Sequence, residues 1–282
     1  MAMINVAAVL SLRNFPQMAL DGWSMIFWYI LFTLTFLIPV SLVAAELAST
    51  WPKAGGIYAW VKEAYPKQGS FITLWCAWTN NIVYFPTVAS FIMVTLSYTI
   101  LEPTFGTNAV FMTIVMLASM WALTFFNFTG MKNSTKLSTM GTLLGTLVPI
   151  GILIAITFAW LLSGHTSNMG DLTASALLPN TGNLLQTFTV ASSLVLMFAG
   201  MKMAGYHARE TENPRRDYPK AMFIAAAIIC LVSIAGTWAV GSIVPADFLN
   251  SENGLNGGII KAFSLALDDF GIGWLLVPFG IM

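Results

Sequence analysis

Charged side chains are scarce in this sequence. Only 9% of the 282 residues are Asp, Glu, Lys or Arg, and 57% are hydrophobic, whereas a soluble domain carries roughly 25% and 45–50%. This excludes a water-soluble globule. The charges also balance, with twelve basic and twelve acidic residues, so no basic surface is present to attract nucleic acid. The sequence contains 10 Trp and 20 Phe, and its apolar runs predict a protein that crosses a lipid bilayer several times.

Cysteines and the motifs of common enzymes are also few or absent. Cys76 and Cys230 both lie inside apolar runs, which favours buried, inert thiols over a disulfide. The sequence contains no His-Glu-x-x-His, serine elbow, phosphate-binding loop or dinucleotide fingerprint. His207 has no second histidine or carboxylate at a metal-ligand spacing, and His165 falls in a loop. We therefore expect no enzyme activity, no cofactor and no metal site.

Long apolar segments account for most of the chain. A helix that crosses a hydrocarbon core of ~30 Å needs about 20 apolar residues. The segment from Leu255 to Phe270 is too charged to cross, and the apolar segment after it is too short, so we expect the chain to be truncated at the start of an eighth span. We predict one all-α, polytopic membrane domain over residues 1–282, with spans near 2–20, 22–47, 69–98, 108–130, 136–162, 184–207, 219–243 and, incomplete, 272–282.

Basic residues gather in three of the connecting segments. Segments 49–68, 131–136 and 208–220 together hold nine of the twelve Lys and Arg residues. Loops rich in Lys and Arg face the cytoplasm. We therefore expect the N-terminus inside and the loop at Asp247 outside.

The first and sixth spans contain sequences that interrupt a helix. Residues 11–16, Ser-Leu-Arg-Asn-Phe-Pro, combine polar side chains with a proline that removes a helix hydrogen bond. Residues 199–206, Ala-Gly-Met-Lys-Met-Ala-Gly-Tyr, place two glycines and a lysine in the sixth span. Charges and unpaired backbone groups at membrane depth occur mainly where they face a water-filled or ligand-filled cavity. Breaks at corresponding places in two halves of a chain indicate an inverted-repeat transporter with its site near the bilayer midplane.

A purely structural interpretation exists for each break. Arg13 can extend to the membrane interface and Pro16 can simply end a helix. Gly200 and Gly205 can let neighbouring helices pack closely. The occurrence of a break in both the first and the sixth span favours the transporter over this alternative.

Four stretches of the chain carry a family resemblance. They are Ala44-Ala45-Glu46-Leu47-Ala48, Ala54-Gly55-Gly56-Ile57-Tyr58-Ala59-Trp60-Val61, Ala199-Gly200-Met201 and Asn213-Pro214-Arg215-Arg216-Asp217-Tyr218-Pro219-Lys220-Ala221-Met222. In these stretches the chain resembles the amino acid, polyamine and organocation (APC) transporter superfamily, most closely the bacterial glutamate/GABA antiporters. The resemblance covers nearly the whole chain but only the first part of the family's length. It implies a LeuT-like fold of two inverted repeats and antiport of amino acids across the cell (inner) membrane.

The resemblance also implies where the substrate binds. The family's substrate-contacting stretches fall on two sets of residues, which are Ser11, Leu12, Arg13 and Asn14 in the first span and Gly200, Met201, Lys202 and Gly205 in the sixth. Many relatives carry glutamate at the position of Lys202, so the charge is reversed here. Lys202 and Arg13 make the expected cavity more positive, which favours a substrate that carries carboxylates.

The sequence also bears on ion coupling and on two other functions, those of a permease fragment and of an ion channel. No Asp or Glu lies near the middle of the six long spans, so a carboxylate relay is not expected and simple exchange fits better. The sequence is also compatible with a truncated, non-transporting membrane fragment of such a permease. An ion channel would need rings of carboxylates or a carbonyl filter, and neither is present in the sequence. The sequence specifies neither the amino acid, the exchange partner nor the oligomeric state.

Overall fold

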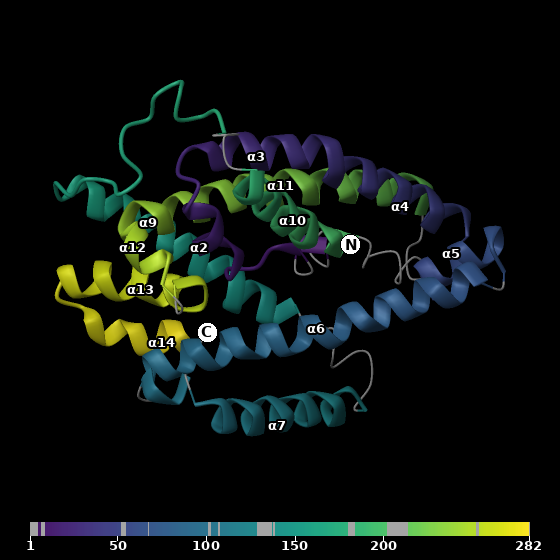
Figure 1. Ribbon diagram of the computed structural model, residues 1–282, viewed down its shortest axis with the longest axis horizontal. Helices are drawn as coiled ribbons and strands as arrows, with labels where there is room; N and C mark the ends of the chain where they lie inside the picture. The colour runs from purple at the N-terminus through teal and green to yellow at the C-terminus, as the bar shows by residue number, and fades with distance from the viewer. Residues whose placement is uncertain are drawn as a thin grey trace. The chain divides into compact units, whose positions relative to one another are not determined.

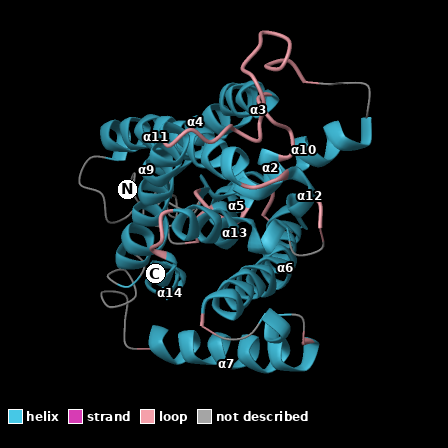
Figure 2. Ribbon diagram, turned by 90° about the vertical axis from the view of Figure 1, so that its left-hand side faces the viewer, coloured by secondary structure: helices cyan, strands magenta, loops and turns pink. Residues whose placement is uncertain are grey.

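The computed structural model describes most of the chain (Figure 1). The described residues are 5–6, 9–51, 55–66, 68–100, 103–106, 108–128, 137, 139–179, 184–201, 214–251 and 254–281. Within these ranges every regular element is a helix, and none is a strand (Figure 2). The predicted all-α class is therefore confirmed.

The helices follow one another along the chain with short connections. Their bounds are α2 Asn14–Ala19, α3 Ser24–Phe32, η1 Thr33–Leu37, α4 Ile38–Thr50, α5 Ile57–Ala64, α6 Gln68–Thr99, η2 Pro103–Gly106, α7 Ala109–Asn127, η3 Leu143–Leu147, α9 Val148–Leu162, α10 Leu184–Phe198, α11 Pro214–Ile243, α12 Ala246–Leu249, α13 Gly254–Asp269, η5 Gly273–Leu275 and α14 Leu276–Ile281.

Five helices among the described residues are long and apolar enough to cross a membrane. They are Ser24–Thr50, Gln68–Thr99, Ala109–Phe126, Thr139–Leu162 and Pro219–Ile243. Each overlaps one of the spans expected from the sequence.

Two of these five helices contain a π-helical turn directly before a proline-containing turn. Thr33–Leu37 precedes Pro39, and Leu143–Leu147 precedes Pro149. A proline has no N–H to donate, and its ring collides with the carbonyl four residues before it. The wider π turn accommodates the ring, so both helices continue without a break.

The outward faces of α6 and α7 are apolar and aromatic. The exposed large side chains include Phe71, Trp75 and Trp78 on α6 and Trp121 and Phe125 on α7. Apolar surfaces of this extent are not stable against water. They fit a bilayer, where Trp and other large apolar side chains contact lipid.

The chain divides into two compact units. One unit comprises Met1–Ser11, Ile26–Tyr84 and Pro179–Ser233, and the other comprises Leu12–Met25, Phe85–Leu178 and Ile234–Met282. The boundaries fall inside α3, α6 and α11, between Leu178 and Pro179, and between Ser11 and Leu12. The boundary between Ser11 and Leu12 lies within the helix break that the sequence predicts at residues 11–16.

In the first unit, α10 packs against the π turn η1. The fully buried side chains of this unit include Tyr29, Leu37, Leu194, Phe198 and Met201. Asn5 is also fully buried, and its Nδ2 donates a hydrogen bond to Sδ of Met222 at 3.0 Å. This contact ties the start of the chain to α11.

In the second unit, α13 packs against α2, α9, α12 and α14. The approach of α13 to α2 is close because Gly258 has no side chain. A Cβ at this position would lie 2.8 Å from Cβ and Cγ of Pro16. Gly236 on α11 likewise lies against the buried ring of Phe15. Glycines thus let two helices reach the short helix α2.

Helix α7 begins behind an asparagine cap. Oδ1 of Asn108 accepts hydrogen bonds from the N–H groups of Val110 and Phe111, both at 3.1 Å. We expect Asn108→Ala to lower the free energy of unfolding by ~1 kcal/mol, because it removes the acceptor. Asn108→Asp keeps the acceptor and is the control. Thermal unfolding in detergent compares the variants, and an unchanged melting temperature in Asn108→Ala would contradict a stabilising cap.

Candidate functional site

The first helix of the chain is interrupted between Leu10 and Asn14. The N–H of Leu10 still donates to the carbonyl of Val6 at 2.8 Å, as in a helix. Leu10 and Ser11 themselves lie outside any helix, and α2 begins only at Asn14. The interruption covers residues 11–13 of the predicted break at 11–16, whereas Asn14, Phe15 and Pro16 lie in α2.

The four residues at this interruption are each half-buried. Ser11, Leu12, Arg13 and Asn14 all have intermediate exposure. Arg13 is the residue before α2 and makes no side-chain cap on the helix. Phe15 and Pro16, which follow, are buried. The segment therefore presents backbone groups, a hydroxyl, an amide and a guanidinium at a break in an apolar helix.

The sixth span also changes its conformation at the predicted position. Helix α10 ends at Phe198, and Ala199–Met201 form a tighter 3-10 turn. The side chain of Met201 is fully buried, and Gly200 has intermediate exposure. Lys202 and Gly205 lie outside the described residues, so their part in the site stays a prediction.

The predicted site residues are divided between the two units. Ser11, Gly200 and Met201 belong to the first unit, whereas Leu12, Arg13 and Asn14 belong to the second. Each unit therefore carries residues from the break in the first span, and the first unit also carries the 3-10 turn of the sixth.

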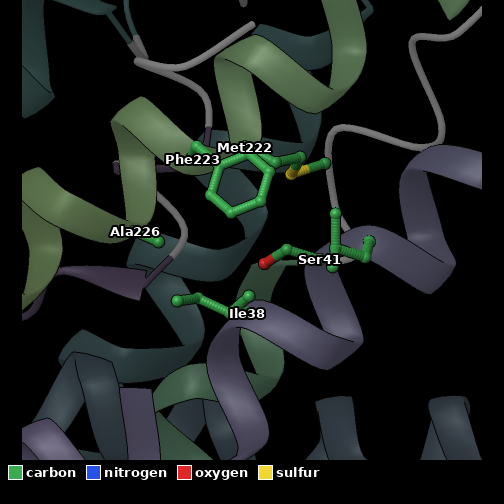
Figure 3. Close-up of a pocket in the computed structure, with 6 residues that line it drawn as sticks. Ile38, Ser41, Met222, Phe223 and Ala226 are labelled. Atoms are coloured by element: carbon green, nitrogen blue, oxygen red, sulfur yellow. The ribbon is translucent and has the colours of Figure 1, made fainter. Parts of the chain in front are cut away.

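A recess lies between α4 and α11 in the first unit (Figure 3). It has an empty volume of ≈ 150 Å³ and is lined by Ile38, Ser41, Leu42, Met222, Phe223 and Ala226. The hydroxyl of Ser41 donates to the carbonyl of Leu37 in its own helix. The recess thus offers no charged group that could hold the carboxylate or ammonium of an amino acid.

Comparison with known proteins decides the family. The family model described as amino acid permease matches residues 1–282, the whole chain. The chain belongs to the amino acid permease family.

Three relatives show how similar this permease-family chain is to known transporters. It is 38% identical to an uncharacterized transporter of Legionella pneumophila, over 98% of this chain and 58% of the relative. It is 28% identical to a glutamate/gamma-aminobutyrate antiporter of Lactococcus lactis, over 99% of this chain and 56% of the relative. It is 24% identical to an aspartate/glutamate permease of Lactococcus lactis, over 94% of this chain and 54% of the relative. The chain therefore spans a little over half the length of these relatives.

The family settles three expectations from the sequence. The resemblance to APC permeases and to glutamate/GABA antiporters is confirmed, and so is the match to only the first part of the family's length. The permease is a multi-pass membrane protein whose family acts on amino acids. The family and these relatives are transporters rather than enzymes, as expected.

The structure of this permease corrects the expectation about its cysteines and shows one further buried polar residue, Asn5. Both cysteines are free thiols, but neither is buried, because Cys76 on α6 is exposed and Cys230 on α11 has intermediate exposure. Cys76 lies on a helix whose apolar face is open to lipid, so an apolar run did not imply burial within the protein. Asn5 was missed, although a lone amide in the apolar run before Ser11 is a signal that could have indicated it. Among the described residues, no group of three or more His, Cys, Asp or Glu could hold a metal ion.

Proposed function

We propose that this chain forms part of a secondary amino-acid transporter that exchanges amino acids, glutamate or GABA among them, by alternating access. The observation that carries the proposal is the interruption of the first helix at Leu10–Arg13 in a member of the amino acid permease family. Irregular backbone at membrane depth is stable only where it is buried in protein or lines a cavity. A break of this kind is the usual place for the substrate of an inverted-repeat transporter.

The residues at the break suit the carboxylate of an amino acid. A carboxylate is held by charge-assisted hydrogen bonds and by the N–H groups at a helix N-terminus. Arg13 supplies a permanent positive charge directly before α2, and Ser11 and Asn14 supply a hydroxyl and an amide. The resemblance adds Gly200, Met201, Lys202 and Gly205 of the sixth span to the proposed substrate-contacting residues. Two cationic side chains favour a substrate with a second carboxylate.

The proposed location is the bacterial cell membrane, which is the inner membrane in a cell that has two. The orientation follows from the basic segments 49–68, 131–136 and 208–220, which favour the cytoplasmic side. On this basis the N-terminus is cytoplasmic. The substrate is the proposed partner of the site, and the bilayer surrounds the spans.

Exchange in proteoliposomes tests the proposed function. The purified chain is reconstituted into vesicles loaded with an unlabelled amino acid, and a panel of labelled amino acids is added outside. The proposal predicts uptake of glutamate or GABA that is faster with unlabelled substrate inside than with empty vesicles. Uptake of lysine or arginine alone, or no binding and no exchange of any amino acid, would contradict it.

A second candidate function is that of a non-transporting membrane fragment of a permease. The observation that favours it is that the chain spans only 54–58% of the length of the three relatives. A permease fragment whose second repeat is incomplete is expected to bind its substrate without alternating its access. Binding of labelled glutamate without exchange in the same vesicles would favour this candidate over the first.

A further inference from the structure

Residues 163–170, here called the strap, link several elements of the second unit. The strap follows α9 directly. Near its end, Nδ2 of Asn168 donates to the carbonyls of Ser242 and Ile243 at 3.1 and 2.9 Å, at the last turn of α11. The carbonyl of Gly170 accepts from Nε1 of Trp23 at 3.1 Å, in the turn between α2 and α3. The strap thus connects α9 with α11 and with the end of α2.

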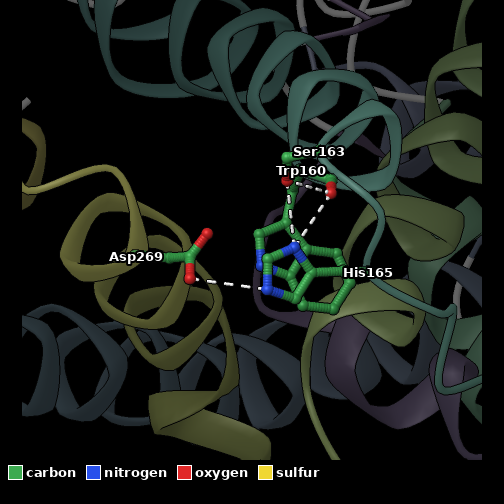
Figure 4. Close-up of polar contacts among 4 residues, drawn as sticks. All are labelled: Trp160, Ser163, His165 and Asp269. Atoms are coloured by element: carbon green, nitrogen blue, oxygen red, sulfur yellow. Dashed lines mark hydrogen bonds and ion pairs between the residues drawn. The ribbon is translucent and has the colours of Figure 1, made fainter.

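The fourth connection of the strap runs through His165 to the end of α13 (Figure 4). Nε2 of His165 lies 3.4 Å from Oδ1 of Asp269, and both side chains are 38% exposed. The imidazole stacks on the indole of Trp160, with ring centroids 4.5 Å apart and an angle of 12° between the planes. Among the contacts of the strap described above, this one alone joins two groups that change charge with pH.

The partners of Nδ1 determine which form of His165 fits this arrangement. Nδ1 lies 3.0 Å from Oγ of Ser163 and 3.2 Å from the carbonyl of Trp160. The hydroxyl of Ser163 already donates its proton to that same carbonyl at 2.7 Å. With the hydroxyl turned to this carbonyl, both groups around Nδ1 present lone pairs, which a proton on this nitrogen satisfies, whereas a hydroxyl turned to Nδ1 donates to a neutral ring.

The partner of Nε2, Asp269, is also a hydrogen-bond acceptor. The carboxylate of Asp269 only accepts hydrogen bonds, so it also needs a proton on the nitrogen that faces it. A neutral imidazole carries one proton and leaves one nitrogen lone pair facing an acceptor. The imidazolium ion carries both protons, and its charge is also attracted to the face of the Trp160 indole.

We propose that His165 is a pH-dependent latch of the strap. In its protonated form it ties the strap to α13 through an ion pair with Asp269, and loss of its proton removes this charge and loosens the tie. Histidine changes charge between pH 5 and 8. Since α13 packs on α2 through the contact of Gly258 with Pro16, the latch changes how firmly α13 holds α2, the helix that follows the break in the first span.

The other charged groups around the latch are mostly acidic. On the described elements that the strap and α13 pack against, they are Asp21, Asp171, Asp247, Lys261 and Asp268. Lys261 lies over the ring of Phe248, with Nζ 5.7 Å from its centroid. Asp268 accepts from the hydroxyl of Ser264 at 3.1 Å. Of these carboxylates and Asp269, Asp269 is the one in direct contact with His165.

Hydrogen exchange in lipid nanodiscs tests the latch without any substrate. Amide exchange of the strap and of residues 264–269 is measured at pH 5.5 and 7.5 and normalised for the intrinsic effect of pH on exchange. We expect normalised exchange about two- to fivefold slower at pH 5.5, as for a partly exposed ion pair. The amides of α7, which carry no part of the latch, are the internal reference and should show no such change.

Three variants test whether His165 and Asp269 cause the pH dependence of amide exchange. His165→Gln and Asp269→Asn should each abolish the pH dependence of normalised exchange, and either one answers the question if the other fails to fold. His207→Gln, which removes the other histidine of the sequence, should retain it. The proposal is overturned if the wild type shows equal protection at both pH values, or if the dependence survives His165→Gln or Asp269→Asn. Since no transport is measured, these outcomes are independent of the proposed function.

Discussion

Replacing Arg13 with methionine should lower the rate of glutamate exchange at least tenfold. Arg13 is half-buried at the interruption that precedes α2. A hydrogen bond to a charged group contributes about 1.5–3 kcal/mol, and each 1.4 kcal/mol corresponds to a factor of ten in affinity. Methionine keeps an unbranched apolar side chain but is shorter than arginine and carries no charge. Initial rates of exchange in proteoliposomes measure the effect.

Two control variants separate loss of the charge from damage to the fold. Arg13→Lys keeps the positive charge and should retain part of the exchange rate, although lysine lacks the paired donors of the guanidinium. Lys62→Met removes a cation from α5, where its Nζ lies 5.7 Å from the ring centroid of Tyr58, and should leave exchange intact. If Arg13→Met exchanged the amino acid as fast as the wild type, Arg13 would not belong to the site.

Replacing Gly258 with alanine is expected to lower the free energy of unfolding by ~1–3 kcal/mol, the usual effect of overpacking. The added Cβ would lie 2.8 Å from two atoms of the Pro16 ring and 3.2 Å from Cδ2 of Leu249. A proline ring is rigid, so α2 itself must move to make room. Helix α13 would then lose its fit against α2. Thermal unfolding in detergent, followed by circular dichroism, measures the change.

Gly257→Ala is the matched control for this substitution. Gly257 is the neighbouring residue on the same helix, and a Cβ there would lie 3.7 Å from the ring of Phe248 and 3.8 Å from that of Tyr98, which is ordinary contact. Alanine in a helix is more favourable than glycine by roughly 0.5–1 kcal/mol. We therefore expect Gly257→Ala to be neutral or stabilising. Equal melting temperatures for the two alanine variants would refute a close fit at Gly258.

The helical class and the position of the first break could be predicted because their signals are local. Apolar runs of about 20 residues report helices that cross a bilayer, whatever their neighbours are. Likewise, polar residues followed by Pro16 disfavour a continuous helix by themselves. The interruption at Leu10–Arg13 overlaps the predicted break at residues 11–13, whereas Pro16 lies in the first turn of α2.

The packing of α13 could not be predicted because it depends on residues far apart in the chain. From the sequence, Lys261, Asp268 and Asp269 make this segment too charged to cross a membrane, and nothing more follows. In the structure, α13 buries Gly254, Gly257 and Gly258 together with a row of apolar side chains. The reason for Gly258 is Pro16, and the sequence does not indicate that these two residues meet.

The polar contacts of the loops could not be predicted either, because they also join residues far apart in the chain. His165 is uninformative in the sequence, because neither Ser163 nor a tryptophan five residues before it suggests a chemical role. Its importance comes from Asp269, which the fold places 3.4 Å from Nε2. A pair of this kind is visible only once the helices that carry it have been arranged.

Substrate protection of a thiol at the break tests the central claim most directly. Ser11→Cys is introduced into a chain that also carries Cys76→Ser and Cys230→Ser, and its alkylation by N-ethylmaleimide is followed with and without glutamate. Ser175→Cys, at an exposed serine in the segment between α9 and α10, is the control. The account predicts that glutamate slows alkylation at position 11 several-fold and leaves position 175 unchanged. If no amino acid that the protein binds or exchanges slowed alkylation at position 11, the substrate would not occupy the break in the first span, and the account would be wrong.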